Sequence, residues 1–156
     1  MRLALAALAL LTALPAQADS VAPKEGWRVI DTSQSYPELL ESLRAAVTAE
    51  KMGLVTEAGP TEVARNRGEE IPGNRVVGVF RNDFAVRAVR LHPQAMIEAP
   101  IRFYVTEDSD GSATLSWKTP SLVFAPYMEA AGPDLEAMAG ELDAIFEAIG
   151  ARATGG

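Results

Sequence analysis

Residues 101–117 read IRFYVTEDSDGSATLSW, and this stretch decides the fold class. Apolar side chains recur at every second position on both sides of its acidic centre: Ile101, Phe103 and Val105 before it, and Ala113, Leu115 and Trp117 after it. A period of two is typical of a β-strand that buries one face. Gly111, at the end of the acidic segment, is able to adopt the positive φ that a tight turn requires. The stretch therefore predicts an antiparallel β-hairpin.

Helical patterns flank this hairpin in the chain. Apolar residues recur at helical spacing over 36–52, 82–91 and 133–149, and the three patterns end at Gly53, at His92-Pro93 and at Gly150. Further strands are expected at 27–31, 54–58 and 75–80, with a short polar helix or loop at 60–70 and a brief apolar segment at 122–127. The elements predict one small α+β domain in the order β-α-β-β-α-β-β-α.

The first 18 residues have the three parts of a cleavable secretory signal. Arg2 supplies a positive start, Leu3 to Leu14 is apolar except for Thr12, and Ala16 and Ala18 are the small residues that a signal peptidase accepts. The apolar run is shorter than the roughly 20 residues that cross a bilayer, which argues against a membrane anchor. We therefore expect cleavage after Ala18 and a mature protein in a bacterial periplasm.

The domain boundaries follow from these patterns. Residues 1–18 form the signal peptide, 19–26 a flexible leader, 27–150 a single α+β domain and 151–156 a flexible tail. Loss of Arg2 takes the formal net charge from −7 to −8, which disfavours nucleic acid and anionic lipid surfaces as partners. Cysteine is absent, so the fold depends on burial, and thiol chemistry is excluded. Met52, Met138, Trp27 and Trp117 are interpreted as core residues.

Arginine is concentrated in one part of the chain. Between Arg65 and Arg102 there are seven arginines and four acidic residues, whereas the segment that follows is acidic. Guanidinium groups bind carboxylates and oxyanions bidentately, so this band predicts an anion site. Arg81 and Asn82, at the start of a helix where backbone N–H groups favour anions, are its best-placed members, with Arg87 and Arg102 as further candidates. Alternatively, the arginines pair with the acidic helices or across a dimer interface.

The other groups of side chains that could carry chemistry give weaker predictions. His92 is the single histidine, and no catalytic serine, phosphate-loop or zinc motif accompanies it, so no catalytic residue and no cofactor is predicted. His92 and Met96 offer a nitrogen and a thioether to copper, but they share a helix face only if the helix persists past Pro93. The acidic hairpin lacks the ligand spacing of a calcium loop. A hydrolase or isomerase that uses His92 or carboxylates stays an alternative.

Several motifs, in their order and spacing, resemble the family catalogued as domain of unknown function 302. They are the Tyr36 to Lys51 helix followed by Gly53-Leu54, the Arg75-Val76-Val77-Gly78 strand leading to Asn82, the Ala85-x-x-Ala88 helix and the segment Ala99 to Glu107. The resemblance implies a compact α+β fold with a curved, mostly antiparallel sheet of about five strands, packed by two or three main helices, and assembly as a homodimer. It implies no reaction.

The chain is thus expected to be an exported bacterial member of that family. Export, the lack of a catalytic motif and the arginine band together predict a non-enzymatic periplasmic binding or accessory protein that holds a small anion or a protein partner. In its mature form it is expected to bind neither nucleic acid nor membrane.

Overall fold

The computed structural model describes residues 21–156, so the expected signal peptide and its cleavage point lie outside the described residues. Within them the strands are β1 (Trp27–Ser35), β2 (Gly53–Ala58), β3 (Asn74–Phe80), β4 (Ile101–Glu107) and β5 (Ser112–Lys118). The helices are α1 (Tyr36–Ala49), α2 (Thr61–Asn66), α3 (Asn82–Leu91), the 3₁₀ helix η1 (Pro93–Glu98), α4 (Pro120–Ala131) and α5 (Pro133–Thr154). No helix of residues 21–156 is long and apolar enough to cross a membrane.

The five strands form one antiparallel sheet in the order β1-β5-β4-β3-β2. The expected hairpin is its centre: β4 and β5 pair with Phe103 opposite Trp117, and Gly111 at the turn has φ +88°. The prediction of an α+β fold with an antiparallel sheet of about five strands is confirmed. Strand β3 lies next to the edge strand β2, and β4 takes the central position of the sheet.

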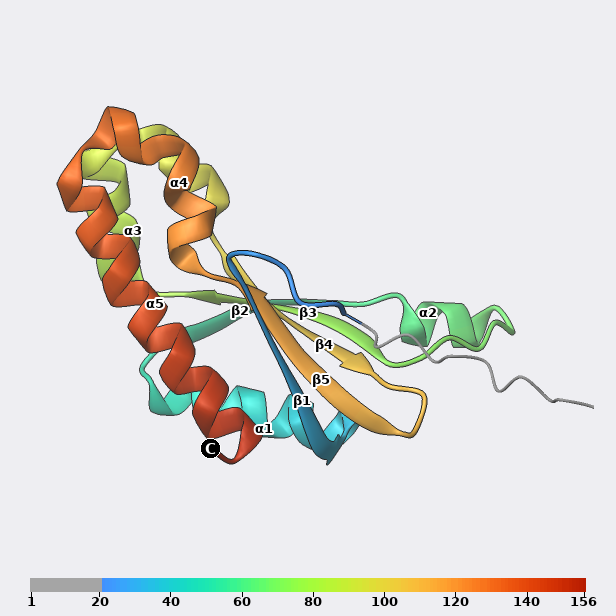
Figure 1. Ribbon diagram of the computed structural model, residues 1–156. Helices are drawn as coiled ribbons and strands as arrows, with labels where there is room; N and C mark the ends of the chain where they lie inside the picture. The colour runs from blue at the N-terminus through green and yellow to red at the C-terminus, as the bar shows by residue number, and fades with distance from the viewer. Residues whose placement is uncertain (1–20) are drawn as a thin grey trace, which may run out of the picture.

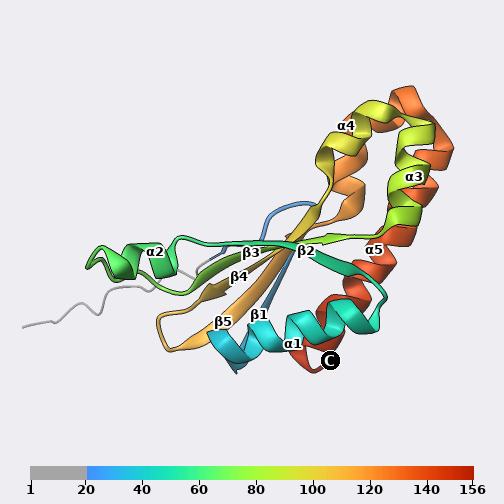
Figure 2. The same cartoon turned by 180° about the vertical axis from the view of Figure 1, so that it is seen from behind.

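Helices cover one face of the sheet, which we call the inner face (Figures 1 and 2). Helix α1 and the C-terminal half of α5 lie against it, and Phe146 of α5 stacks on Phe103 of β4 with ring centroids 4.7 Å apart. The N-terminal half of α5 continues past the end of the sheet and packs with α3, η1 and α4 into what we call the helical arm. No helix of residues 21–156 forms a layer on the opposite, outer face.

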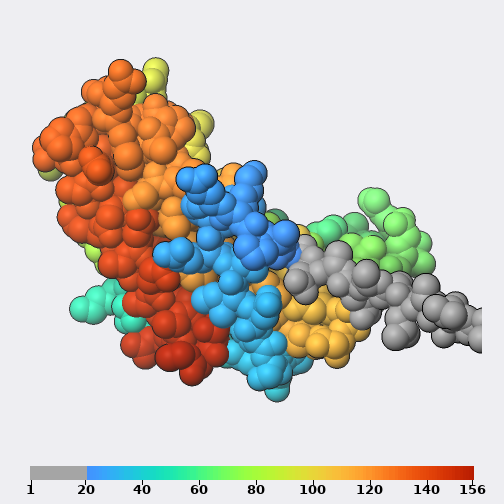
Figure 3. Space-filling view, in the orientation of Figure 1, coloured from blue at the N-terminus to red at the C-terminus, as the bar shows by residue number. Residues whose placement is uncertain are grey.

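The space-filling view shows the helical arm and the α2 segment projecting on different sides of the sheet (Figure 3). The core is continuous from the inner face into the arm, because α5 contributes buried residues to both: Leu135, Met138 and Leu142 in its first half and Phe146, Ile149 and Ala153 in its second. The position of the helical arm relative to the sheet is therefore fixed by the packing of α5 in this shared core.

Three sequence expectations need correction. Residues 120–131 form the full helix α4, with Thr119 as an N-cap whose hydroxyl accepts the Leu122 N–H at 3.2 Å, rather than a brief apolar segment. The last helix runs through Gly150 to Thr154, so the 151–156 tail is mostly helical, and its Ala153 is 1% exposed. Trp27 is not a core residue, since it lies half-buried on the outer face of β1.

Candidate functional site

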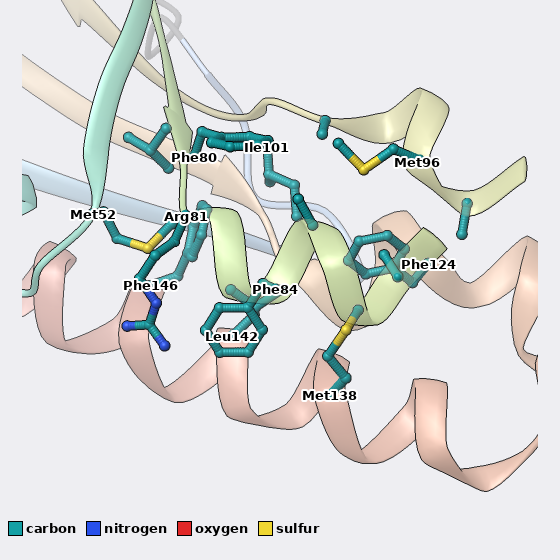
Figure 4. A pocket seen from close by; sticks show the side chains of 15 residues that line it. Met52, Phe80, Arg81, Phe84, Met96, Ile101, Phe124, Met138, Leu142 and Phe146 are labelled. Carbon is teal, nitrogen blue, oxygen red and sulfur yellow. The ribbon is translucent and has the colours of Figure 1, made fainter. Parts of the chain in front are cut away.

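A pocket lies where the helical arm meets the end of the sheet (Figure 4). Its inner wall consists of side chains that are at most 8% exposed: Met52, Val79, Phe84, Ala88, Ala95, Ile101, Phe124, Met138, Leu142 and Phe146. Its mouth is made of partly exposed residues at the ends of β3, α3 and η1: Phe80, Arg81, Ala85, Met96 and Ala99. The pocket is thus apolar inside and reached from the side where α3 begins.

The lining combines small and flexible side chains. Four alanines from α3, η1 and the segment after η1 leave space opposite the aromatic residues, and three methionines enter from different elements (Figure 4). The cavity has a volume of about 40 Å³, little more than the ~30 Å³ share of one water molecule in the liquid. Methionine is unbranched and repacks readily, so the lining is able to admit a larger group.

Arg81 is the one charged residue among the described residues that line this pocket. It occupies the N-cap position of α3, and its guanidinium carbon lies 4.3 Å from the centroid of the Phe84 ring. Its Nε donates to Oδ1 of Asp83 at 2.8 Å, and this bond is the main reason that the pKa of Asp83 lies below its ordinary value. Arg81 is therefore placed between the apolar lining and solvent.

Arg87 lies six residues after Arg81 in α3, with its guanidinium carbon 5.3 Å from the centroid of the same Phe84 ring. Two of its nitrogens donate to the carboxylate of Glu141 on α5, at 2.7 and 2.8 Å. The pair raises the pKa of Arg87 and lowers that of Glu141. Arg87 thus pairs with an acidic helix, which is the alternative reading of the arginine band.

The other two predicted residues lie outside the pocket. Asn82 is exposed at the first position of α3 and does not line it. Arg102 is on β4 between the inward-facing Ile101 and Phe103, so it belongs to the outer face of the sheet. The structure therefore brings Arg81 and Arg87 together over the Phe84 ring, whereas Asn82 is exposed and Arg102 lies on the outer face of the sheet.

His92 and Met96 do not form a shared helical face. Helix α3 ends at Leu91, His92 is extended with φ −159°, and Pro93 starts η1, so the condition for a nitrogen and thioether pair on one helix is not met. The His92 ring lies 5.9 Å from the Tyr127 ring, whereas Met96 lines the pocket. Among residues 21–156, no group of three or more histidine and acidic side chains is placed to hold a metal ion.

Sequence reasoning missed most of the pocket. Met52 and Met138 were interpreted as core, and nothing in their neighbourhood in the chain marks them as facing a cavity. The local signal that exists is the row of alanines on α3 and η1, since small residues on the apolar side of a helix leave room for another group.

Comparisons with known proteins support the sequence resemblance. No curated protein matches the chain. A crystal structure of an uncharacterized conserved DUF302 protein from Bacillus stearothermophilus is similar with a TM-score of 0.72, over 83% of this chain and 99% of that chain, at 17% sequence identity. At that identity the likeness concerns the fold. The model of the family described as Domain of unknown function DUF302 matches residues 29–151, nearly all of the described chain. The chain therefore belongs to the DUF302 family.

Proposed function

We propose that this protein is an exported, non-enzymatic binding protein that holds a small amphipathic anion in the pocket between the helical arm and the sheet. The ligand class is a short-chain carboxylate or sulfonate with an apolar body. The observation that carries the proposal is the lining itself, which is apolar throughout its inner wall and has one cation, Arg81, at the mouth.

The charge and the apolar lining select the same kind of ligand. An alkyl or aryl group that enters the pocket leaves water at a gain of roughly 0.8 kcal/mol per buried CH₂ group. A carboxylate at its outer end meets the Arg81 guanidinium, which forms charge-assisted hydrogen bonds to such groups. Because Arg81 is the N-cap of α3, the positive end of the helix dipole lies on the same side.

Binding is favoured over catalysis by the chemistry of the lining. Apart from Arg81, none of the described lining residues is titratable, so the pocket offers no general base and no nucleophile. His92, the residue of the enzymatic alternative, contacts Tyr127 and does not line the pocket. Export is supported by the signal pattern of residues 1–18, and a mature protein that starts at Asp19 in the periplasmic fraction is the expected result.

Thermal denaturation with a series of straight-chain carboxylates, from acetate to octanoate, tests the proposal. The affinity is expected to rise about fourfold for each methylene that enters the pocket, until the cavity is filled. Alcohols of the same length should bind about tenfold more weakly, because they lack the charge that Arg81 recognises. Equal stabilisation by all lengths, or by none, would contradict the proposal.

Two variants with matched controls locate the site. Arg81→Gln should reduce carboxylate affinity to that of the alcohol, whereas Arg90→Gln, on the exposed side of the same helix, should not change it. Ala85→Met narrows the mouth and should abolish binding, whereas Val86→Met, at a neighbouring position that is 38% exposed, should leave it intact. Assembly as a homodimer stays a separate prediction, which light scattering of the mature chain decides.

A further inference from the structure

A second concave site lies on the outer face of the sheet, next to the η1 and α4 segments of the helical arm. It is a groove of about 410 Å³, within the range of roughly 300–1,000 Å³ that small-molecule sites occupy. Strand β4 contributes Arg102 and Tyr104, β1 and β5 contribute Trp27 and Lys118, and η1 contributes Glu98. The groove and the apolar pocket have Ile101 in common, but Glu98, Arg102 and Lys118 line the groove alone.

Opposite charges line the groove without neutralising one another. Among residues 21–156, Arg102 and Lys118 make no ion pair with a carboxylate, although Glu98 lines the same groove. Both side chains are exposed, so both charges are accessible to a ligand in the groove. Arg102 and Lys118 also lie on adjacent strands, where like charges repel. A bound anion offsets that repulsion.

Two of the three charged groups of the groove, Glu98 and Lys118, contact an aromatic neighbour. The hydroxyl of Tyr127 on α4 donates to Oε1 of Glu98 at 2.7 Å, which fixes the carboxylate on the arm side of the groove. The ammonium of Lys118 lies 5.5 Å from the centroid of the Trp27 ring, the residue opposite it in the β1–β5 register. The groove therefore has cations on the sheet and a carboxylate on the arm, and Trp27 and Tyr104 add aromatic surface to its lining.

We propose that this groove binds a free amino acid with an apolar side chain. Its carboxylate is bound by Arg102 and Lys118, its ammonium by Glu98, and its side chain packs on Trp27 and Tyr104. A ligand of this kind satisfies charges of both signs at once, whereas a simple anion leaves the Glu98 carboxylate without a cationic partner. The site is distinct from the amphipathic-anion pocket and does not depend on it.

Calorimetric titration with three compounds that share one aromatic body tests the charge requirement. L-Phenylalanine carries both charges, 3-phenylpropionate lacks the ammonium, and phenethylamine lacks the carboxylate. L-Phenylalanine is expected to bind at least tenfold more tightly than either of the others, and to change the fluorescence of Trp27. Because Trp117 is only 2% exposed, Trp27→Phe should remove that change.

Paired variants assign each charge to its residue. Glu98→Gln should abolish the preference for L-phenylalanine over 3-phenylpropionate, and Arg102→Gln should abolish its preference over phenethylamine. Glu129→Gln and Arg90→Gln change the net charge in the same way at exposed positions away from the groove, and both preferences should survive in them. If 3-phenylpropionate bound as tightly as L-phenylalanine, or if no compound bound, the proposal would be overturned. Binding that survives Arg102→Gln but not Arg81→Gln would place the ligand in the other site and would also overturn it.

Discussion

The backbone of Gly150 lies directly against the indole of Trp117. A Cβ atom placed on Gly150 would stand 2.4 Å from Cη2 of Trp117, closer than real Cβ contacts come. The indole has no room to retreat, because Trp117 is 2% exposed and its ring packs on Phe103 with centroids 5.3 Å apart. Helix α5 thus approaches β5 as closely as it does because position 150 has no side chain.

Gly150→Ala is therefore expected to lower the free energy of unfolding by about 1–3 kcal/mol, the usual cost of overpacking a filled core. The higher helix propensity of alanine, about 1 kcal/mol, offsets part of this cost. Urea denaturation followed by far-UV circular dichroism measures the change.

Gly140→Ala is the matched control for that prediction, because Gly140 lies in the same helix and a Cβ there would have no atom within 4 Å. At this position only the higher helix propensity of alanine acts, so the substitution should raise the free energy of unfolding by about 0.5–1 kcal/mol. If both substitutions were stabilising, the close packing of α5 on Trp117 would be wrong.

Asp143 of α5 holds the first turn of α4. Its Oδ1 accepts the Ser121 N–H at 2.9 Å, and its Oδ2 accepts the Ser121 hydroxyl. Asp143→Ala leaves that N–H without a partner and should cost about 1 kcal/mol, as the loss of an N-cap does. In Asp143→Ala, hydrogen exchange at the backbone amides of residues 121–124 should become faster than exchange at the amides of α3. Asp143→Asn keeps an acceptor and should show the smaller effect of the two.

The Arg44–Glu57 pair links α1 to the edge strand β2 and makes stability depend on pH. Arg44 donates to both carboxylate oxygens of Glu57, at 2.8 and 2.7 Å, and lowers the pKa of Glu57 below its ordinary value of 4.5. Because the folded pKa is the lower one, the stabilisation is complete above pH 4.5 and is lost as the pH falls through the folded pKa. Glu57→Gln should lower the free energy of unfolding by about 1 kcal/mol at pH 7. The same substitution should change it by almost nothing at a pH below the folded pKa of Glu57. Glu69→Gln, at an exposed position, should show no such dependence.

The end of α5 gives a test of the corrected boundary. The carbonyl of Ala153 accepts a hydrogen bond from Nε2 of Gln34 at 2.8 Å, and Ala153 is 1% exposed. A chain that stops at Gly150 should therefore be less stable by about 1–2 kcal/mol, through the lost bond and the lost burial. Removal of Gly155 and Gly156 alone should change stability little. If the two truncated chains were equally stable, the prediction that residues 151–156 form a flexible tail would hold after all.

Local periodicity predicted most of the fold. The hairpin of β4 and β5, helix α1 and helix α3 each show their repeat within a single segment, and the capping residues Ser35 and Glu38 lie where the sequence places the helix start. The last helix was predicted too short because glycine is the usual stop signal. Gly150 serves another purpose, its contact with Trp117, and that contact joins segments 33 positions apart.

The site was predictable only in part, for the same reason. Arg81 could be placed at the start of a helix from the sequence, and that is where it lies. Arg102 lies apart from Arg81 because its side of β4 is the face that no helix of residues 21–156 covers. The helix that covers the other face, α5, comes much later in the chain, so the sequence near Arg102 does not show this. The pocket lining also comes from separate elements, so no single segment carries its signature.

Helix α5 spans about 33 Å without an internal proline and is at once a wall of the pocket and the layer beneath the sheet. The helical arm therefore has no hinge of its own along this element. Melting of the arm would break α5 in its middle and expose buried side chains on both sides of the break. The arm and the sheet are therefore expected to unfold in one cooperative transition, and a ligand in the pocket would raise its midpoint.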